Sequence, residues 1–439
     1  MKRRYFGTDG VRGTFGGPLI NPTFAARLAE AAARWSGEAG TVLVGRDTRE
    51  SGVALLQGLA AGFHAAGWVV VDLGVLPTPA VARAVRERGS DLGVVITASH
   101  NPATDNGIKF FGPGGIKFND EQELEIEARL PEEAADAPAQ ANATENALQG
   151  YIHELATVLP AGGLAGWKIV VDTANGATTQ TTPFLLELLG AEVVRIGASP
   201  SGHNINAGVG SEHPEALAAE VQASGAALGI AHDGDGDRCV LCAEKGAILD
   251  GDEILTILAM DGIRSGSLAN TTLVITQQSN LGVDAAIRSV GGTVLRTNIG
   301  DRYVAERMRE VGASLGGESS GHIICDEIGP TGDGLGAALQ VLQVMLSSGQ
   351  PLSELRKALQ KFPQKAGALA VARKPPISEC PHLTAAMNEL EHELGERGRI
   401  LVRYSGTESK LRLLIEGSTE KIVDEGYDRL EEAARKDLS

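Results

Sequence analysis

Three acidic residues alternate with glycine in the segment DGDGDR, residues 233–238. Carboxylates at this spacing supply the hard oxygen ligands that Mg²⁺ and Ca²⁺ prefer. Counted from Asp233, the segment also resembles a calcium EF-hand loop with Glu244 at its twelfth position. An EF-hand needs glycine at its sixth position, where this chain has Arg238, and the flanking residues have the character of strands rather than helices. The spacing therefore favours a magnesium site over a calcium-binding module. Its ligands would be Asp233, Asp235 and Asp237.

A second loop, TASHNPATDNGIKFF (97–111), follows an apolar strand and brings Ser99, His100 and Lys109 close together. Mg²⁺ keeps few protein ligands and usually takes a phosphate oxygen as well. A serine at a strand end beside such a site could carry a phosphoryl group, and a lysine could balance charge or move a proton. Alone, Ser99 and His100 would be ordinary loop residues. Their occurrence together with the metal loop indicates catalysis.

The segment GESSGH (317–322) contains the G-x-S-x-G pattern of a hydrolase nucleophile elbow. That motif needs a helix after its serine, but β-branched and then glycine-rich residues follow here, which disfavours a serine hydrolase. The alternative is a loop that binds a sugar. Glu318 could accept hydrogen bonds from vicinal hydroxyls with Ser320 beside it, and His322 could transfer a proton near neutral pH.

A fourth segment, RYSGTE (403–408), combines an arginine, two hydroxyls and free backbone N–H groups in a tight loop. These groups together suit the binding of an anion such as phosphate. Read alone, the segment fits an ordinary surface turn equally well. The residues that would form the anion site are Arg403, Ser405, Gly406 and Thr407.

The elements that must position these loops form a repeat of strand, helix, strand and third strand, which occurs three times. The third strand of each unit runs directly into one of the first three loops, at LGVVITASHNP (92–102), LGIAHDGDGDR (228–238) and SLGGESSGH (314–322). Alternating strands and helices indicate βαβ units with a largely parallel sheet, and ligands of such sheets bind beyond the carboxyl ends of the strands. We therefore predict three related α/β domains and a smaller final domain. Their predicted ranges are 1–148 with the serine loop, 149–250 with the metal loop, 251–364 with the sugar loop and 365–439 with the phosphate loop.

The charge, apolar runs and cysteines of the chain exclude several classes of protein. The chain of 439 residues has 56 acidic and 39 basic residues, a net charge of −17 that disfavours nucleic acid and anionic lipid as partners. It has no signal peptide pattern and no apolar run as long as a membrane span. Four cysteines do not make a disulfide framework, and CVLC (239–242) is predicted to be a buried strand rather than a zinc or redox site. We expect a cytoplasmic protein.

In their order and separations, the four loops resemble those of the α-D-phosphohexomutase superfamily. The similarity also includes YFGTDGVRG (5–13) and PTGDG (330–334) and covers nearly the whole chain. Within the superfamily, the opening segment, the serine loop and GDRYV (300–304) are most similar to the branch of bacterial phosphoglucosamine mutases. Ser319 departs from the Gln or Asn usual there and from the Met of the phosphomannomutase/phosphoglucomutase branch, which is the alternative assignment.

The resemblance implies an α/β fold of three related domains with mixed sheets and a smaller C-terminal α+β domain around a central cleft. It implies that Ser99 is phosphorylated and that one Mg²⁺ per chain is bound by the three aspartates and a phosphoserine oxygen. Glu318 and Ser320 would bind the sugar, and residues 403–407 its non-reacting phosphate. The groups expected around the reacting phosphoryl group are Arg12, His100, Lys109, Arg238 and His322.

The activity implied by the resemblance is the interconversion of glucosamine 6-phosphate and glucosamine 1-phosphate. A sugar 1,6-bisphosphate would be its intermediate and activator, and the product would supply amino-sugar nucleotide and cell-wall precursor synthesis. The expected partner is a small phosphosugar, and a homodimer is left open as the assembly.

Overall fold

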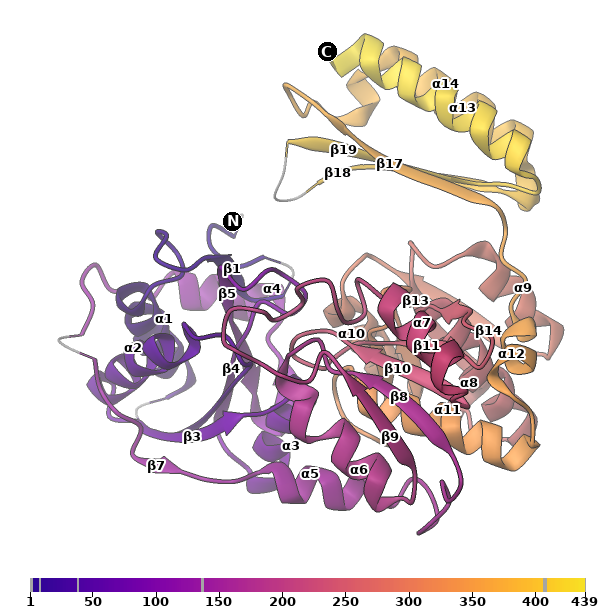
Figure 1. The fold of residues 1–439 in the computed structure, drawn as a ribbon. Helices are drawn as coiled ribbons and strands as arrows, with labels where there is room; N and C mark the ends of the chain where they lie inside the picture. Colours follow the sequence, from indigo (N-terminus) through magenta and orange to yellow (C-terminus); the bar gives the residue numbers. More distant parts are fainter. Residues whose placement is uncertain (1–2, 8, 38, 136–137, 406–408, 439) are drawn as a thin grey trace. The chain divides into compact units, whose positions relative to one another are not determined.

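In the computed structural model, the described residues are 3–7, 9–37, 39–135, 138–405 and 409–438. They form two compact units, one of residues 1–279 and 287–358 and the other of residues 280–286 and 359–439. The first unit contains three β-sheets with their helices, and the second contains one smaller sheet (Figure 1). Among the described residues, no helix is both long enough and apolar enough to cross a membrane.

The first sheet has the strand order β1-β5-β4-β2-β3-β7, with β6 paired to β5. Strands β4, β2, β3 and β7 run parallel, whereas β1, β5 and β6 join as antiparallel strands. The strands are β1 Val11–Thr14, β2 Thr41–Arg46, β3 Val69–Val75, β4 Leu92–Ile96, β5 Asp105–Gly112, β6 Ile116–Lys117 and β7 Ala143–Thr144. The helices are α1 Pro22–Ser36, α2 Gly52–Ala65, α3 Thr78–Arg88, the 3₁₀ turn η1 Pro113–Gly115 and α4 Asp120–Glu127.

The second sheet has the order β12-β11-β10-β8-β9, in which β9, β8 and β10 are parallel and β11 and β12 are antiparallel additions. Its strands are β8 Lys168–Asp172, β9 Glu192–Ile196, β10 Leu228–His232, β11 Cys239–Ala243 and β12 Ile248–Leu249. Its helices are α5 Leu148–Leu155, η2 Ala177–Gln180, α6 Thr182–Leu188 and α7 Glu215–Ser224.

The third sheet repeats this design in the order β14-β13-β15-β16, with only β16 antiparallel. Its strands are β13 Thr272–Thr276, β14 Thr293–Thr297, β15 Leu315–Gly317 and β16 Ile323–Cys325. Its helices are α8 Gly251–Ser265, η3 Ala269–Thr271, α9 Leu281–Ser289, α10 Asp301–Val311, α11 Gly334–Ser348, α12 Leu352–Leu355 and η4 Arg356–Ala358. In all three sheets, a parallel strand therefore turns back into an antiparallel neighbour, and the turns β4–β5, β10–β11 and β15–β16 are the serine, metal and sugar loops.

The second unit is an antiparallel sheet of order β17-β19-β18 with α13 and α14 on one face (Figure 1). Its elements are β17 Gln364–Ala370, η5 Ile377–Glu379, α13 Pro381–Leu394, η6 Gly395–Arg397, β18 Arg399–Tyr404, β19 Lys410–Glu416 and α14 Glu420–Leu438. Apolar residues of the sheet and both helices form one core, including Leu383, Leu413, Ile415 and Leu430. The apolar stripe of α14 explains its burial against the sheet, since helices of this kind are stabilised mainly by packing.

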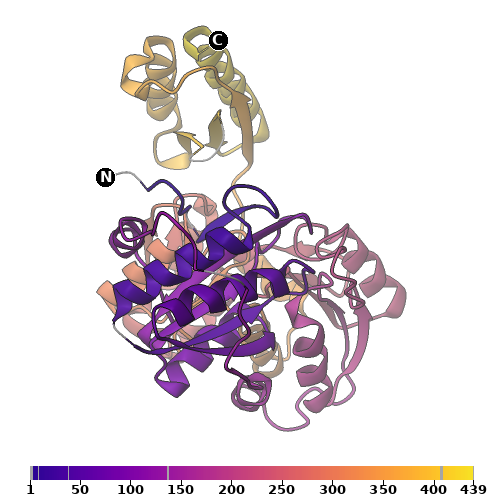
Figure 2. The same cartoon turned by 90° about the vertical axis from the view of Figure 1, so that its left-hand side faces the viewer.

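Glycine allows the two helices on one side of the first sheet to approach closely, as Figure 2 shows from the side of the violet helices α1 and α2. A Cβ atom on Gly62 would lie 2.0 Å from the carbonyl oxygen of Ala26, and one on Gly58 would lie 2.3 Å from that of Pro22. No side chain fits at either position. The helices thereby bury the apolar face that covers β2 and β4, whose residues are almost all inaccessible to solvent.

The buried Asp333 of the PTGDG segment joins elements of different sheets. It caps α11 by accepting a hydrogen bond from the Gly336 amide at 2.8 Å, and it accepts a second from the Tyr151 hydroxyl at 2.9 Å. Burial raises the pKa of Asp333 to about 6, although these hydrogen bonds oppose the shift. A carboxyl group with a raised folded-state pKa binds more protons in the folded than in the unfolded chain between the two pKa values, so its contribution favours folding at acid pH and is lost as pH rises.

Asp333→Asn keeps the cap and the acceptor for Tyr151 but removes this titration. We expect the stability of the variant relative to the natural chain to increase by roughly 1–3 kcal/mol between about pH 4.5 and about pH 7.5. Urea unfolding of both proteins across that range measures the difference. An equal pH dependence in the two proteins would show that Asp333 is not the titrating group.

Candidate active site

Ser99 begins the turn between β4 and β5 in an unusual backbone conformation. Its φ of 52° lies in the left-handed region, which costs a non-glycine residue roughly 1–2 kcal/mol. The side chain is 1 % exposed, and its hydroxyl donates to Asp233 Oδ2 at 2.5 Å. The conformation therefore directs the serine hydroxyl from the first sheet toward the metal loop of the second.

Contacts to backbone carbonyls hold the serine loop in this conformation. Arg49 is buried, and its Nε donates to Asp47 Oδ2 at 2.9 Å. Asn206 Nδ2 donates to the Ser99 carbonyl at 2.8 Å. The guanidinium of Arg49 donates to the carbonyls of Ser99 at 3.1 Å, Asn101 at 2.7 Å, Asp105 at 2.8 Å and Pro102. These bonds over-determine the loop, as a strained functional backbone requires.

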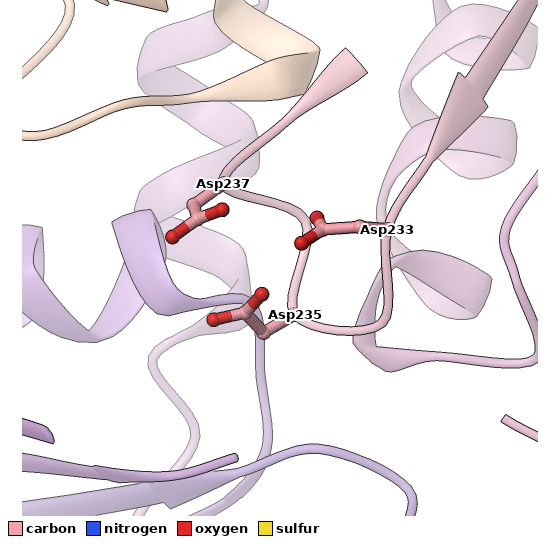
Figure 3. Close-up of side chains that lie close together, drawn as sticks. All are labelled: Asp233, Asp235 and Asp237. Atoms are coloured by element: carbon pink, nitrogen blue, oxygen red, sulfur yellow. The ribbon is translucent and has the colours of Figure 1, made fainter. Parts of the chain in front are cut away.

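The three aspartates of the metal loop point toward one another from the turn between β10 and β11 (Figure 3). One carboxylate oxygen from each of Asp233, Asp235 and Asp237 lies within 4.8 Å of the other two, and all three residues are buried. Two further oxygens, Asp235 Oδ1 and Asp237 Oδ1, are buried without a hydrogen-bond partner among the described residues. Buried carboxylate oxygens that lack donors are what a divalent cation would satisfy, so this group can bind a metal.

Lysine is the principal counter-charge of the aspartate cluster. Val95 and Lys109 are partners in the β4–β5 register, which places Lys109 Nζ 2.8 Å from Asp235 Oδ2, 2.8 Å from Asp9 Oδ2 and 3.3 Å from Asp237 Oδ2. Burial alone would lower the pKa of Lys109, but the carboxylates outweigh it and hold that pKa well above its usual value. Lys109 is therefore charged here.

The aspartates themselves titrate differently. Burial and the neighbouring carboxylates of Asp235 and Asp237 raise the pKa of Asp233 well above its ordinary value. For Asp237, burial is outweighed by Lys109 and His322, which hold its pKa well below that value. Asp233, which bonds Ser99, is thus protonated more readily than an ordinary carboxylate, and a bound cation beside it would favour its ionised form.

A histidine contacts the serine, and the charges of two arginines act on that histidine. Arg12 pairs with Asp9, and its buried Nε has no hydrogen-bond partner among the described residues. The guanidinium of Arg238 lies 3.9 Å from Asp237 and 3.8 Å from Glu212. His100 Nδ1 is 3.2 Å from Ser99 Oγ, and burial with the positive charges of Arg238 and Arg12 lowers its pKa to about 4. His100 is consequently neutral at neutral pH.

The sugar loop presents groups suited to binding and proton transfer. Glu318 accepts a hydrogen bond from the Gly300 amide at 3.0 Å, and burial raises its pKa. Ser320 Oγ is buried and lacks a partner among the described residues, so its hydroxyl is available to a ligand. His322 Nδ1 lies 3.6 Å from Asp237 Oδ1, while its Nε2 accepts from the Gly332 amide at 3.1 Å. The two acids beside it, Asp301 and Asp237, overcome burial and raise its pKa.

In the second unit, Arg403 is the penultimate residue of β18 and pairs with Arg412 of β19. Burial and the charge of Arg412 lower the pKa of Arg403, as expected where two cations lie close together. Ser405 is buried, and Lys374 Nζ donates to its carbonyl at 2.7 Å, adding a third cation to this end of the sheet. Gly406 and Thr407 lie outside the described residues.

The structure bears out the rejection of two other interpretations. Strands rather than helices flank the metal loop, and Glu244, the twelfth residue of the EF-hand comparison, bonds Ser353 instead. A strand, β16, follows the G-x-S-x-G segment where a hydrolase elbow needs a helix. Cys239 and Cys242 are buried in β11 with free thiols.

Nearly the whole chain matches known families of enzyme domains. Residues 3–137, 149–246 and 250–362 match the phosphoglucomutase/phosphomannomutase alpha/beta/alpha domains I, II and III, and residues 353–433 match the C-terminal domain. The chain belongs to the phosphoglucomutase/phosphomannomutase family. This membership confirms the predicted superfamily and fold class, while the exact bounds of the predicted domains stay a prediction.

Relatives of this phosphohexomutase are named phosphoglucosamine mutase. One from Nitratidesulfovibrio vulgaris (strain DP4) is 45 % identical over 449 residues and covers 100 % of both chains. Another, from Halorhodospira halophila, is 45 % identical over 435 residues, covering 96 % of this chain and 94 % of the relative.

Solved structures show the same fold at low identity. A phosphoglucomutase/phosphomannomutase family protein from Burkholderia thailandensis aligns with a TM-score of 0.81 at 24 % identity and covers 98 % of this chain and 97 % of its own. An N-acetylphosphoglucosamine mutase from Aspergillus fumigatus, solved with GlcNAc-6P and magnesium, aligns with a TM-score of 0.67 at 19 % identity and covers 100 % of this chain and 96 % of its own.

Several residues of the site were not foreseen from the sequence. Thr78, at the start of α3, donates to Asp235 Oδ2 at 2.6 Å, although it is far along the sequence from every recognised loop. Asp47 and Arg49 lie in the polar turn after β2, and their position at the end of a strand could have indicated that they belong to the site. Asp9 lies within the recognised opening segment, but its contacts with two lysines depend on strand register, which that segment does not reveal.

Arg49→Lys should preserve the charge beside Asp47 but lose most of the carbonyl bonds that hold the serine loop. Because misplacing a reacting group by about 1 Å can cost on the order of 100-fold in rate, we expect kcat to fall roughly 10- to 100-fold. Steady-state kinetics of mutase activity measures the change, with Arg86→Lys, at an exposed position of α3, as control. A kcat equal to that of the natural chain would mean that Asn206 alone positions the loop.

Proposed function

We propose that this phosphohexomutase is a phosphoglucosamine mutase, interconverting glucosamine 6-phosphate and glucosamine 1-phosphate. The observation that carries the proposal is the 2.5 Å contact between Ser99 Oγ and Asp233 inside a buried group of three aspartates. The full-length relatives with this name support the choice of amino sugar. The product would enter amino-sugar nucleotide and cell-wall precursor synthesis in the cytoplasm.

Ser99 is the phosphoryl carrier in this proposal. The bond between Ser99 Oγ and phosphorus breaks as a sugar hydroxyl oxygen bonds the phosphorus, and the hydroxyl proton leaves to a base. The resulting 1,6-bisphosphate reorients and returns its other phosphoryl group to Ser99, which regenerates the phosphoserine and releases the isomer. Such transfers depend on positioning and charge neutralisation, so a bisphosphate that escapes would need to be replaced from solution as an activator.

One Mg²⁺ per chain would be held by Asp233, Asp235 and Asp237 together with an oxygen of phospho-Ser99. When bound, it would supply the positive charge that neutralises the transferring phosphoryl oxygens. Arg12 and Arg238 would add fixed positive charge around the same oxygens. His100 is neutral, so it can donate a hydrogen bond to the serine oxygen without attracting the three aspartates that would bind the metal.

Two groups can take the proton of the attacking hydroxyl, Lys109 and His322. Lys109 is charged among its three carboxylates and so serves first to balance the phosphoryl charge. His322 accepts a hydrogen bond from the Gly332 amide at Nε2, so this nitrogen carries no proton in that arrangement and can accept one. Protonation there would exchange the Gly332 contact for one with Asp301, 3.4 Å away.

The rest of the substrate is bound at two places. Glu318 and the unpartnered hydroxyl of Ser320 accept and donate hydrogen bonds to the sugar hydroxyls. Arg403, Ser405, Gly406 and Thr407 bind the phosphate that is not reacting. Because either isomer presents one phosphate to the serine and one to this site, a single set of groups serves both directions.

A phosphomannomutase/phosphoglucomutase of the same family is the alternative. Ser319 is shorter than Gln or Asn and would reach the C2 substituent only through water, which discriminates less by geometry. Specificity constants for the glucosamine, glucose and mannose phosphates separate the two assignments, and a preference for glucose or mannose phosphate would overturn the amino-sugar proposal.

Ser99→Ala should remove the phosphoryl carrier while leaving the fold intact. We expect mutase activity to fall at least about 1,000-fold, because phosphoryl transfer can then no longer proceed through a phosphoserine. A coupled assay from glucosamine 6-phosphate, with and without bisphosphate, measures activity, and intact-mass analysis counts the phosphate on each protein. Ser347→Ala, at an exposed position near the end of α11, is the control. Full activity in Ser99→Ala would eliminate phosphoserine as the carrier.

Asp235→Asn tests the metal ligands, since it keeps side-chain size and removes one charge. We expect weaker Mg²⁺ binding by about 10-fold or more, because a hard cation binds through ligand charge. Calorimetric titration of Mg²⁺ measures the affinity directly, and higher Mg²⁺ should partly restore activity. An unchanged Mg²⁺ affinity would place the metal elsewhere.

A further inference from the structure

The segment GDRYV, at the start of α10, connects the sugar loop with the sheet that carries Ser99. Its first residue, Gly300, donates its amide to Glu318 Oε1 at 3.0 Å. The next three residues, Asp301, Arg302 and Tyr303, each contact residues 117–123 of the first sheet and α4. Four consecutive residues therefore contact either the sugar loop or the domain of the serine.

Asp301 is the residue of this segment nearest the chemistry. Its Oδ2 lies 3.4 Å from His322 Nε2 and also pairs with Lys117 Nζ. Lys117 in turn lies 2.9 Å from Asp9 Oδ1, and Asp9 Oδ2 lies 2.8 Å from Lys109 Nζ. A line of alternating charges thus runs from Asp301 through Lys117 and Asp9 to Lys109, with the ring of His322 at the Asp301 end.

These charges hold one another in their ionised forms. Burial alone would raise the pKa of Asp301, but Lys117 and His322 outweigh it and keep that pKa below its ordinary value. The side chains of Asp301 and Lys117 are 10 % and 13 % exposed, so water screens their attraction little. The pair is therefore a fixed contact, unlike an ion pair in solvent.

Arg302 anchors the same segment from the other side. It is buried, and its NH1 atom donates to the Phe118 carbonyl at 3.1 Å and lies 2.9 Å from Glu123 Oε2. Its NH2 atom lies 2.6 Å from Asp120 Oδ1. With this anchor in place, a change at Asp301 alters the contact with His322 while the attachment of α10 to the first domain remains.

We propose that Asp301, held by Lys117, is a positioning residue that fixes the His322 ring relative to Ser99 during phosphoryl transfer. This inference rests on the proposed function. His322 comes from the third sheet and Ser99 from the first. The Lys117–Asp301 ion pair joins these two domains, and its Asp301 carboxylate lies beside the His322 ring. Catalytic groups must be kept within about 0.5 Å of their productive positions, and an ion pair between buried side chains provides that restraint.

The test compares Asp301→Asn, Lys117→Gln and the double variant with the natural chain, with Arg309→Gln on the exposed face of α10 as control. Asparagine keeps the shape of the side chain but loses the charge that attracts Lys117 and His322. We expect kcat to fall at least 10-fold in each single variant, with KM for glucosamine 6-phosphate within about 3-fold. Because both residues act through one contact, the double variant should be no more than about 3-fold slower than the slower single variant. Lys117→Arg keeps the charge and should recover most of the activity.

Thermal unfolding of every variant separates positioning from folding. Lowered melting temperatures with unchanged kcat per folded molecule would overturn the inference, because Asp301 would then only stabilise the domain contact. Multiplicative losses in the double variant would also overturn it, since Lys117 and Asp301 would act independently. If Asp301→Asn does not fold, the kcat of Lys117→Gln decides alone, and an unchanged value refutes the proposal. Absence of mutase activity in the natural chain would instead refute the proposed function.

Discussion

Three carboxylates buried within reach of one another impose the constraint on which the rest of the site depends. Water would otherwise solvate these charges, and burying them without compensation costs several kcal/mol each. Lys109 pairs with Asp235 and Asp237, and Arg238 lies near Asp237. Asp9 joins Lys109 to Lys117 and Arg12. The positive groups thus compensate part of the cost of burying these carboxylates.

The same turn, repeated in three sheets, explains how distant segments meet. In each sheet a buried parallel strand reverses into an antiparallel neighbour, and the reversal carries polar groups to the carboxyl end of the sheet. One repeat supplies the serine, the next the carboxylates and the third the sugar loop. A shared backbone design therefore supports three different chemistries, each set by a few side chains in its turn.

The sequence predicted the loops better than the contacts between them. Ser99, Asp233 and His322 follow strands whose apolar composition is evident, so their position at the ends of those strands was predictable. Lys109 faces the aspartates only because Val95 is its partner in the register of β4 and β5, and register across a hairpin depends on the turn. Thr78 and Asn206 contact the site from segments without any motif, because the packing of whole domains brings them there. The alternation of strands and helices indicated a largely parallel sheet, because strand composition alone does not reveal hairpins, and the mixed sheets that the structure contains were expected from the family resemblance.

Arg49 recognises the serine loop through carbonyl oxygens alone, and so does Asn206. Every residue has a carbonyl, so these contacts are indifferent to which side chains the loop carries between Asn101 and Asp105. These contacts thus fix the path of the loop without contacting the side chains of residues 102–104, whereas Asn101 and Asp105 also bond each other through their side chains. Evolution can exchange those side chains to suit a different sugar or a different rate, and the serine hydroxyl will still arrive at the same point in space.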